Sequence, residues 1–420
     1  MVVLSPLHPP VETAFFCDDA EVRQIIVSPA MAERVLPIAK GRRVLMTGEA
    51  KSGTGALVEP EPDDAALQLY TSGTTGKPKG AALSHVNLAV QQDLLAEAWG
   101  WTAADVLLHA LPLHHLHGLG IALLTALGAG ASARLLPAFD PAAVWHAMSA
   151  STVFMAVPTM YTKLLAALDS ADEATRARWS SNARRLRLST SGSAALPVTL
   201  GERWRALTGT YPLERFGMTE IGVGMTNPLR GERRPGCVGM PLPTVETRIV
   251  GEDHHDAPTG ELWIRGESVF SGYFKRDDAT RHAFQDGWFK TGDTVTKDET
   301  GYFKILGRTS VDILKSGGYK LSALEIEEVL REHPGVSEVA VVGVPDETWG
   351  ERVVACVVPR SGLEKECTEA ALRAFAKTRL AAYKVPKTVL NVADLPRNAM
   401  GKVMKSELVR SVSALVETKG

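Results

Sequence analysis

The chain has 420 residues, 45% of them hydrophobic and 22% charged, which is an ordinary globular composition and enough for two or three domains. Its net charge of −2 gives no overall field that favours nucleic acid or an anionic membrane. Four scattered cysteines without a Cys-x-x-Cys spacing argue against a disulfide framework and favour a reducing compartment, here the cytoplasm. The most apolar run, "GLGIALLTALGAGA", is too short and glycine-rich to be a membrane-spanning helix.

Strands and helices alternate over the first 240 residues. The run "ALQLY", ending at Tyr70, predicts a buried strand, and Ser84 is placed to open an amphipathic helix. Short apolar strands then alternate with helices: "DVLLHALPL", "ASARLLP", "STVFMAVP" and "LRLSTSG". This alternation predicts an α/β sheet domain. Between 245 and 307, short strands separated by turns predict a smaller β subdomain.

The pattern changes again after Arg308. Ser322 and Glu325 have capping-box spacing before a helix, followed by the strands "SEVAVVGVP" and "RVVACVVP", a helix at about 368–382 and the strand "KTVLNV". We therefore predict a large α/β domain with several sheets and a β subdomain over 1–307, and a small, mobile α+β domain over 308–420. The boundary is expected within "LGRTSVDILKSGG", 306–318.

The stretch "YTSGTTGKPKG", Tyr70 to Gly80, has the chemistry of an anion-binding loop. Pro78 and the glycine spacing do not fit a Walker loop, which leads directly into a helix. Its hydroxyls, glycine N–H groups and lysines still suit phosphate, although a solvated surface turn is the alternative. The predicted phosphate-binding residues are Thr71, Ser72, Gly73, Thr74, Thr75, Gly76, Lys77 and Lys79.

Five further motifs follow this loop: "RFGMTE" (215–220), "GWFKTGD" (287–293), "GYFKILGR" (301–308), "KSGGYKLSALEIE" (315–327) and "PRNAMGK" (396–402). Their order and spacing from about 65 to 410 resemble those of the adenylate-forming, AMP-binding superfamily. That resemblance implies a two-step reaction. A carboxylate attacks the α-phosphate of ATP, and CoA then takes the acyl group and releases AMP.

The resemblance also implies roles for individual residues. Glu220 would bind Mg²⁺, Thr219 would touch the α-phosphate, and Lys402 would bridge the carboxylate and that phosphate. The nucleotide would be held by Gly192, Ser193, Ala194, Glu214, Arg215, Phe216, Gly217, Thr219, Asp293 and Arg308. CoA would pass Ser316, Gly317 and Gly318, after the small domain rotates about 308–312. Without the motif context, Glu220, Asp293 and Lys402 would read as a loop carboxylate, a turn aspartate and an exposed lysine.

Two stretches bear on the identity of the acid. "LPLHHLHGLG" and "RLRLSTSGSAALP" resemble the malonyl-CoA and methylmalonyl-CoA synthetases within the superfamily. The resemblance implies that Arg187 and His117 bind a distal carboxylate, that Met225 borders the α-carbon, and that His115 lies nearer the reacting carboxyl. A buried arginine needs an anion opposite it, which supports a dicarboxylate. A zinc site at the histidines and a solvent-facing Arg187 are the alternatives.

Two other functions remain open at this stage: a ligase for short or medium monocarboxylates, and an inactive nucleotide-binding remnant. The second arises because only 69 residues precede Tyr70, where the superfamily has a longer segment. The front of the large domain is therefore expected to be incomplete, through truncation or as a short form. Part of an apolar sheet face would then lack its cover.

Overall fold

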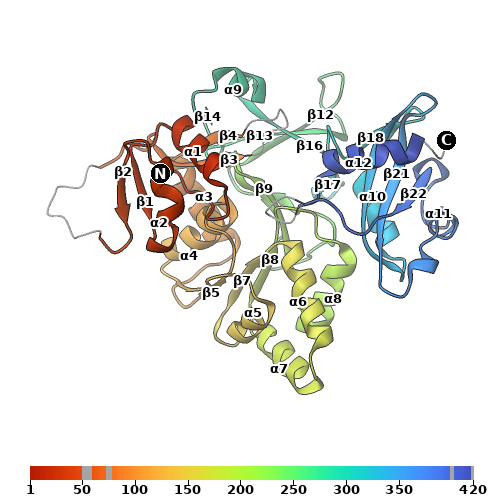
Figure 1. The fold of residues 1–420 in the computed structure, drawn as a ribbon, viewed down its shortest axis with the longest axis horizontal. Helices are drawn as coiled ribbons and strands as arrows, with labels where there is room; N and C mark the ends of the chain where they lie inside the picture. Colours follow the sequence, from red (N-terminus) through yellow and green to blue (C-terminus); the bar gives the residue numbers. More distant parts are fainter. Residues whose placement is uncertain (50–58, 72–77, 398–401, 418–420) are drawn as a thin grey trace.

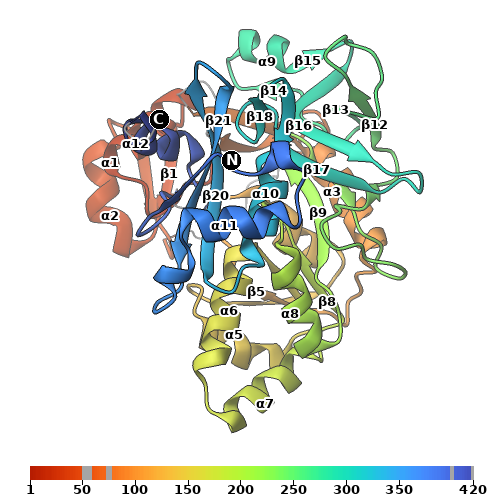
Figure 2. The ribbon, with the colours of Figure 1, turned by 90° about the vertical axis from the view of Figure 1, so that its right-hand side faces the viewer.

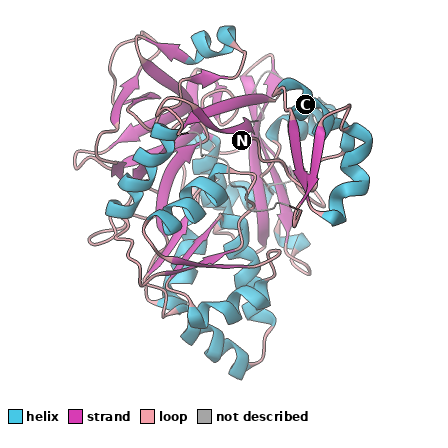
Figure 3. Cartoon of the chain, turned by 90° about the vertical axis from the view of Figure 1, so that its left-hand side faces the viewer, coloured by secondary structure: helices cyan, strands magenta, loops and turns pink. Residues whose placement is uncertain are grey.

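The computed structural model describes residues 1–49, 59–71, 78–397 and 402–417. Figure 1 shows the N-terminal elements at one side, the helices α5 to α8 below, and the C-terminal elements at the other side. Helices and strands are interspersed through much of the molecule (Figure 3). The predicted mixed α/β architecture with several sheets is confirmed. No helix among the described residues is long and apolar enough to span a bilayer.

The central sheet has the order β11-β10-β9-β8-β7-β5-β6. Strands β9, β8, β7, β5 and β6 run parallel, whereas β10 and β11 are antiparallel additions at one end. Their bounds are β5 Val106–His109, β6 Ser132–Leu135, β7 Val153–Ala156, β8 Leu188–Ser191, β9 Leu213–Met218, β10 Gly222–Thr226 and β11 Met240–Pro241. In β7 and β8 every residue is buried, as expected for parallel strands covered on both faces.

Helices connect these strands. They are α3 His85–Ala98, α4 Thr125–Gly128, α5 Pro141–Ala147, α6 Pro158–Ser170, α7 Glu173–Ala183 and α8 Val198–Thr208, with a π-helix His117–Leu124 before α4. As predicted, α3 begins after Ser84. The Ser84 hydroxyl accepts from Asn87 N, and the Asn87 side chain accepts in return from Ser84 N.

The N-terminal elements form two small sheets. Strands β1 Gln24–Val27 and β2 Arg43–Met46 pair in parallel next to α1 Pro10–Asp19 and α2 Pro29–Val35. The second sheet has the order β14-β4-β3, with β3 Ala65–Thr71, β4 Lys79–Ser84 and β14 Gly272–Tyr273. The predicted phosphate loop therefore joins two antiparallel strands.

The predicted β subdomain is an antiparallel sheet in the order β12-β13-β16-β15, with β17 also paired to β16. Its strands are β12 Glu246–Val250, β13 Thr259–Arg265, β15 Phe284–Gln285, β16 Trp288–Lys297 and β17 Phe303–Arg308, and α9 Asp277–Ala283 precedes β15. Side chains along β16 alternate between buried and less buried, which is the period of a sheet with one covered face.

The C-terminal region contains the sheet β19-β18-β21-β20, with β22 paired to β21 (Figure 2). Its elements are β18 Ile313–Ser316, β19 Tyr319–Ser322, α10 Ala323–Arg331, β20 Val336–Asp346, β21 Gly350–Pro359, α11 Glu369–Lys377, β22 Thr388–Asn391 and α12 Lys405–Glu417. Val339 and Val341 pack in one hydrophobic cluster with α10 and α11 residues, while Ala340 and Val342 pack with α12 residues on the opposite face. Both clusters are separate from the core of the preceding region.

Candidate active site

The carboxyl ends of parallel strands bring several predicted residues to one edge of the central sheet. His117 lies after β5, Ser193 after β8, and Glu220 after β9. The His117 Nδ1 atom lies 3.2 Å from the Ser193 hydroxyl, which joins segments 76 residues apart. Open α/β sheets bind ligands beyond the carboxyl ends of their strands, so this edge is the expected location of a site.

Glu220 lies next to Thr71, the last described residue before the phosphate loop. Its carboxylate is buried and accepts a 2.9 Å hydrogen bond from the Tyr273 hydroxyl. Burial raises the pKa of Glu220, against hydrogen bonds from Tyr273 and Thr71 and the charge of Arg308. The Lys79 ammonium lies 5.3 Å from the centre of the Tyr273 ring. The structure thus brings Thr71, at one end of the phosphate loop, next to this carboxylate, and Lys79, at the other end, next to Tyr273.

The rest of the predicted phosphate loop, Ser72, Gly73, Thr74, Thr75, Gly76 and Lys77, lies outside the described residues.

Asp293, Arg308 and Lys402 form a second charged group. Asp293 and Arg308 are register partners on β16 and β17, and Arg308 Nε lies 3.2 Å from Asp293 Oδ1. Burial raises the pKa of Asp293 to about 6, although the charges of Arg308 and Lys402 oppose the shift. Burial and Arg308 lower the pKa of Lys402, while Asp312 and Asp293 oppose that change. A lysine from the end of the chain therefore lies among residues of the β subdomain.

Arg215 has the burial and the need for an anionic partner that were expected of Arg187. Its side chain is 4% exposed, and Nε and Nη2 have no hydrogen-bond partner among the described residues. Burial lowers the pKa of Arg215 to about 10. A Cβ atom on Gly192 would lie 2.4 Å from Arg215 Nε, so a larger residue there would displace the guanidinium. Burial, together with Arg215, holds the pKa of His117 well below its usual value, which keeps the imidazole neutral.

The structure does not support the predicted substrate role of Arg187. Its Nε and Nη2 atoms each donate a 2.6 Å hydrogen bond to Asp105, and Nη1 donates to the Trp99 carbonyl at 2.9 Å. Arg187 immediately precedes β8, at the end opposite Ser193, about 13 Å from Ser191 at 3.3 Å per strand residue. Its charge is therefore satisfied within the protein, away from the candidate site.

The other predicted nucleotide and substrate residues are distributed around the same edge. Phe216 and Met225 are register partners on β9 and β10, and Met225 is fully buried. Glu214 accepts a 2.8 Å hydrogen bond from Gly236 N, and burial raises its pKa to about 8. Ala194, Gly217 and Thr219 continue the segments that carry Ser193, Arg215 and Glu220. His115 packs against His114 with a centroid separation of 4.1 Å, and burial lowers its pKa.

The predicted CoA residues lie at a different position. Ser316 ends β18, and Gly317 and Gly318 form its turn into β19, with Gly317 N donating to the Trp349 carbonyl at 2.9 Å. The flanking Lys315 and Lys320 both contact Glu252 of the β subdomain.

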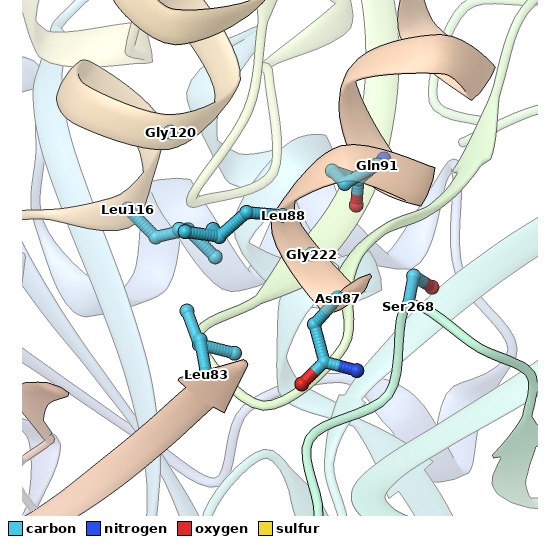
Figure 4. Close-up of a pocket in the computed structure, with 8 residues that line it drawn as sticks. All are labelled: Leu83, Asn87, Leu88, Gln91, Leu116, Gly120, Gly222 and Ser268. Atoms are coloured by element: carbon cyan, nitrogen blue, oxygen red, sulfur yellow. The ribbon is translucent and has the colours of Figure 1, made fainter. Parts of the chain in front are cut away.

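Sequence reasoning missed two side chains of α3, Asn87 and Gln91, which line the pocket in Figure 4 and contact segments close to Glu220 in the chain or in space. Gln91 Oε1 accepts a 2.5 Å hydrogen bond from Val223 N, two residues beyond the turn that follows Glu220. Gly222 has φ +69°, and a Cβ atom there would lie 1.7 Å from Gln91 Oε1. Asn87 donates to the carbonyls of Glu267 and Val269. The available signal was two amides one helical turn apart, within an otherwise apolar helix face.

Comparison with known proteins agrees with this geometry. The profile described as AMP-binding enzyme matches residues 1–274, and that described as AMP-binding enzyme C-terminal domain matches 325–402. A Mus musculus protein named malonate–CoA ligase ACSF3, mitochondrial, is 43% identical over 96% of this chain and 76% of its own length. An Arabidopsis thaliana protein named malonate–CoA ligase is 46% identical over 83% of this chain and 61% of its own length.

Solved structures resemble the chain over nearly its whole length. The ATP-bound crystal structure of MatB from Rhodopseudomonas palustris has a TM-score of 0.90 and 38% identity, covering 99% of this chain and 84% of MatB. A malonyl-CoA ligase complex with methylmalonyl-CoA and AMP has a TM-score of 0.69 at 38% identity, covering 94% of this chain and 85% of that one. The chain belongs to the family of AMP-binding enzymes.

Proposed function

We propose that the protein is an ATP-dependent acid–CoA ligase that converts malonate or methylmalonate into its CoA thioester through an acyl-adenylate. The ligase class follows from the family. The observation that carries the choice of acid is the buried guanidinium of Arg215, which lacks partners for Nε and Nη2 among the described residues and lies beside neutral His117. A buried cation of this kind needs an anion opposite it.

A dicarboxylate would meet that need. Its reacting carboxylate would face the ATP phosphates, and its distal carboxylate would accept hydrogen bonds from Arg215. His117 would donate one more, because a neutral imidazole has one N–H donor and its Nε2 has no partner among the described residues. Relatives named as malonate–CoA ligases support this choice. In this proposal Arg215, rather than Arg187, lies opposite the distal carboxylate.

In the first half-reaction the chain's residues would align two anions that repel each other. Asp293 would accept hydrogen bonds from the ribose hydroxyls of ATP, Phe216 would stack on adenine, and Thr219 would donate to the α-phosphate. Lys402 would lie between the attacking carboxylate and the α-phosphate and offset their charges. One oxygen of the acid would bond to the α-phosphorus as the bond to pyrophosphate breaks, and pyrophosphate would leave.

The residues present fit a magnesium ion held jointly with ATP. Mg²⁺ is usually bound through one or two carboxylates together with substrate phosphates and water. Glu220 is a buried carboxylate beside Thr71, and a cation next to it would offset the burial that raises its pKa. When bound, the ion would neutralise charge on the phosphates. Glu220 would hold it, and Tyr273 would orient Glu220 through their 2.9 Å hydrogen bond.

In the second half-reaction the thiol of CoA would attack the acyl carbonyl, and AMP would leave. Lys402 would have to withdraw, because the thiol would need the space beside the acyl carbonyl that Lys402 is proposed to fill. Rotation of the small domain about the linker near 308–312 would remove it and bring Ser316, Gly317 and Gly318 toward the pantetheine arm. A boundary between domains at 307–308 is consistent with the two separate sets of hydrophobic clusters.

The test is pyrophosphate release with ATP, Mg²⁺ and CoA across malonate, methylmalonate, acetate, butyrate and benzoate. Turnover restricted to the dicarboxylates supports the proposal. Turnover restricted to monocarboxylates would retain the ligase and reject the role of Arg215. Absence of turnover with every acid, in a protein that binds AMP, would favour a nucleotide-binding remnant.

For the location we propose the cytoplasm, based on the four cysteines without a disulfide among the described residues. Three mammalian relatives, from Mus musculus, Bos taurus and Homo sapiens, carry the word mitochondrial in their names. Fractionation of cells with detection of the endogenous protein distinguishes the two compartments.

A further inference from the structure

Lys405, the first residue of α12, is a buried lysine between two carboxylates. Its side chain is 10% exposed, and its Nζ atom lies 2.5 Å from Asp312 Oδ1 and 2.6 Å from Glu327 Oε1. Burial alone would lower the pKa of Lys405, but Glu327 and Asp312 raise it, so the ammonium stays charged. None of the family motifs considered above assigns a role to this residue.

Each carboxylate extends the contact to another element. Asp312 Oδ2 accepts a 2.9 Å hydrogen bond from Arg308 N, at the end of β17. Glu327 Oε1 accepts a 2.8 Å hydrogen bond from Val341 N, in the middle of β20. Lys405 therefore ties the start of α12 both to the linker and to the interior of the small domain.

Lys402 lies three residues before Lys405, within about 10 Å along an extended chain. Between them, Val403 pairs with Arg397 in an isolated bridge, and Met404 N donates a 2.7 Å hydrogen bond to the Pro396 carbonyl. The two residues between Lys402 and Lys405 are thus fixed to residues 396 and 397. Asp312 and Lys405 both act electrostatically on Lys402, so the two lysines share one local charge environment.

We propose that Lys405 is a positioning residue that holds Lys402 in place for adenylation by fastening its segment to Asp312 and Glu327. The inference rests on the proposed role of Lys402. Arg308 is paired with Asp293 of the large domain, whereas Asp312 is bonded to Lys405 of the small domain. Rotation about the linker would therefore break the bond from Arg308 N to Asp312. The Lys405–Glu327 pair, which lies within the small domain, would remain.

Because of this difference between the contacts, loss of Lys405 should affect the two half-reactions unequally. Adenylation needs Lys402 at a fixed place relative to Arg308 and Asp293, whereas thiol attack takes place after Lys402 has withdrawn. A displacement of about 1 Å at a reacting centre lowers a rate by about 100-fold. Loss of the Lys405 contacts should accordingly slow acyl-adenylate formation by about 100-fold and thiol transfer by about threefold or less.

The experiment measures each half-reaction in the full chain carrying Lys405→Met. Acid-dependent exchange of pyrophosphate into ATP reports adenylation, and CoA thioester formation from preformed acyl-adenylate reports the second step. Lys384→Met is the matched control, because Lys384 pairs with Glu325 of the same helix α10 at 2.6 and 2.8 Å but does not contact the Lys402 segment in any described pair. Lys384→Met should leave the rates of both half-reactions within about twofold of those of the parent protein.

Asp312→Asn is the second variant and keeps Lys405 paired with Glu327. It should give the same selective loss of adenylation, smaller at about tenfold, even if Lys405→Met folds poorly. Equal losses in both half-reactions, following a lower melting temperature, would show that Lys405 only stabilises the small domain. Lys402→Ala separates the two hypotheses. If Lys402→Ala forms the adenylate at the normal rate, the proposed role of Lys402 is wrong. If Lys402→Ala does not form the adenylate but Lys405→Met does so at the normal rate, only the inference about Lys405 is overturned.

Discussion

Arg187 donates to both oxygens of Asp105 in a paired geometry, with each hydrogen bond 2.6 Å long. The pair connects the segment before β5 to the segment before β8, at the amino end of the central sheet. Although burial opposes it, the hydrogen bonds from Arg187 and Thr152 hold the pKa of Asp105 at about 2. The pair therefore stabilises the fold, and it lies at the end of the sheet opposite the candidate site.

The first prediction concerns stability in acid. A carboxyl whose folded-state pKa is depressed stabilises the fold above its ordinary pKa, and this contribution is lost as the pH falls from about 4 to about 2. Asp105→Asn should lower the free energy of unfolding by about 2 kcal/mol at pH 7, with a difference from the parent that shrinks below pH 4. Urea unfolding at several pH values measures it. A difference that is independent of pH would contradict the assignment.

The second prediction concerns substrate choice. Arg215→Met should lower kcat/KM for malonate by about 100-fold or more, because the distal carboxylate would be buried without its partner. For monocarboxylates such as butyrate, kcat/KM of this variant should fall only slightly or rise. Steady-state kinetics with both acids give the ratio.

Arg187→Met is the control for this comparison. It should lower the melting temperature but leave the ratio of the two acids unchanged within about twofold. A selective loss of malonate in Arg187→Met, and none in Arg215→Met, would reverse the assignment made here.

The third prediction is a pH dependence of nucleotide binding. Burial raises the pKa of Asp293 to about 6, and only its ionised form accepts hydrogen bonds from both ribose hydroxyls without donating. AMP affinity should therefore fall about tenfold from pH 7 to pH 5, because protonation competes with binding. Asp293→Asn should bind AMP weakly and without this dependence. Calorimetric titration across that range measures both, and identical profiles would exclude Asp293 as the ribose acceptor.

The fourth prediction concerns the turn behind Glu220. Gly222→Ala combines a left-handed backbone with a Cβ atom 1.7 Å from Gln91 Oε1, so the turn or Gln91 must shift. We expect a loss of about 1–3 kcal/mol in stability and a raised KM for magnesium-ATP. Gly209→Ala is the matched control, because Gly209 has φ +86° and no atom within 4 Å of its added Cβ. It should lose stability yet keep the KM of the parent.

Local sequence patterns were sufficient for much of the fold. The Ser84 cap, the strand before the phosphate loop and the change to β subdomain near residue 245 depend on neighbouring residues, and the structure contains each of them. The two-residue period of a strand also correctly predicted that Arg187 lies on the face opposite its leucine neighbours. That period carries no information about which end of a strand faces a ligand, and this is where the prediction for Arg187 was wrong.

The position of Arg215 depends on contacts that no local pattern contains. Its guanidinium lies against Gly192, which belongs to the neighbouring strand's exit loop 23 residues earlier, and near His117, which follows β5. A motif reading grouped Arg215 with Phe216 because they are adjacent in sequence. In a strand, adjacent side chains point to opposite faces, so the two residues serve different surfaces.

The buried charge of Arg215 also affects how the protein can be studied. A cation held out of water without an anion destabilises the folded state, and a ligand that supplies the anion relieves this strain. The free enzyme should therefore melt at a lower temperature than the enzyme that has bound its dicarboxylate. A melting curve recorded with each candidate acid alone, before ATP or CoA is added, then becomes a direct screen for the natural substrate.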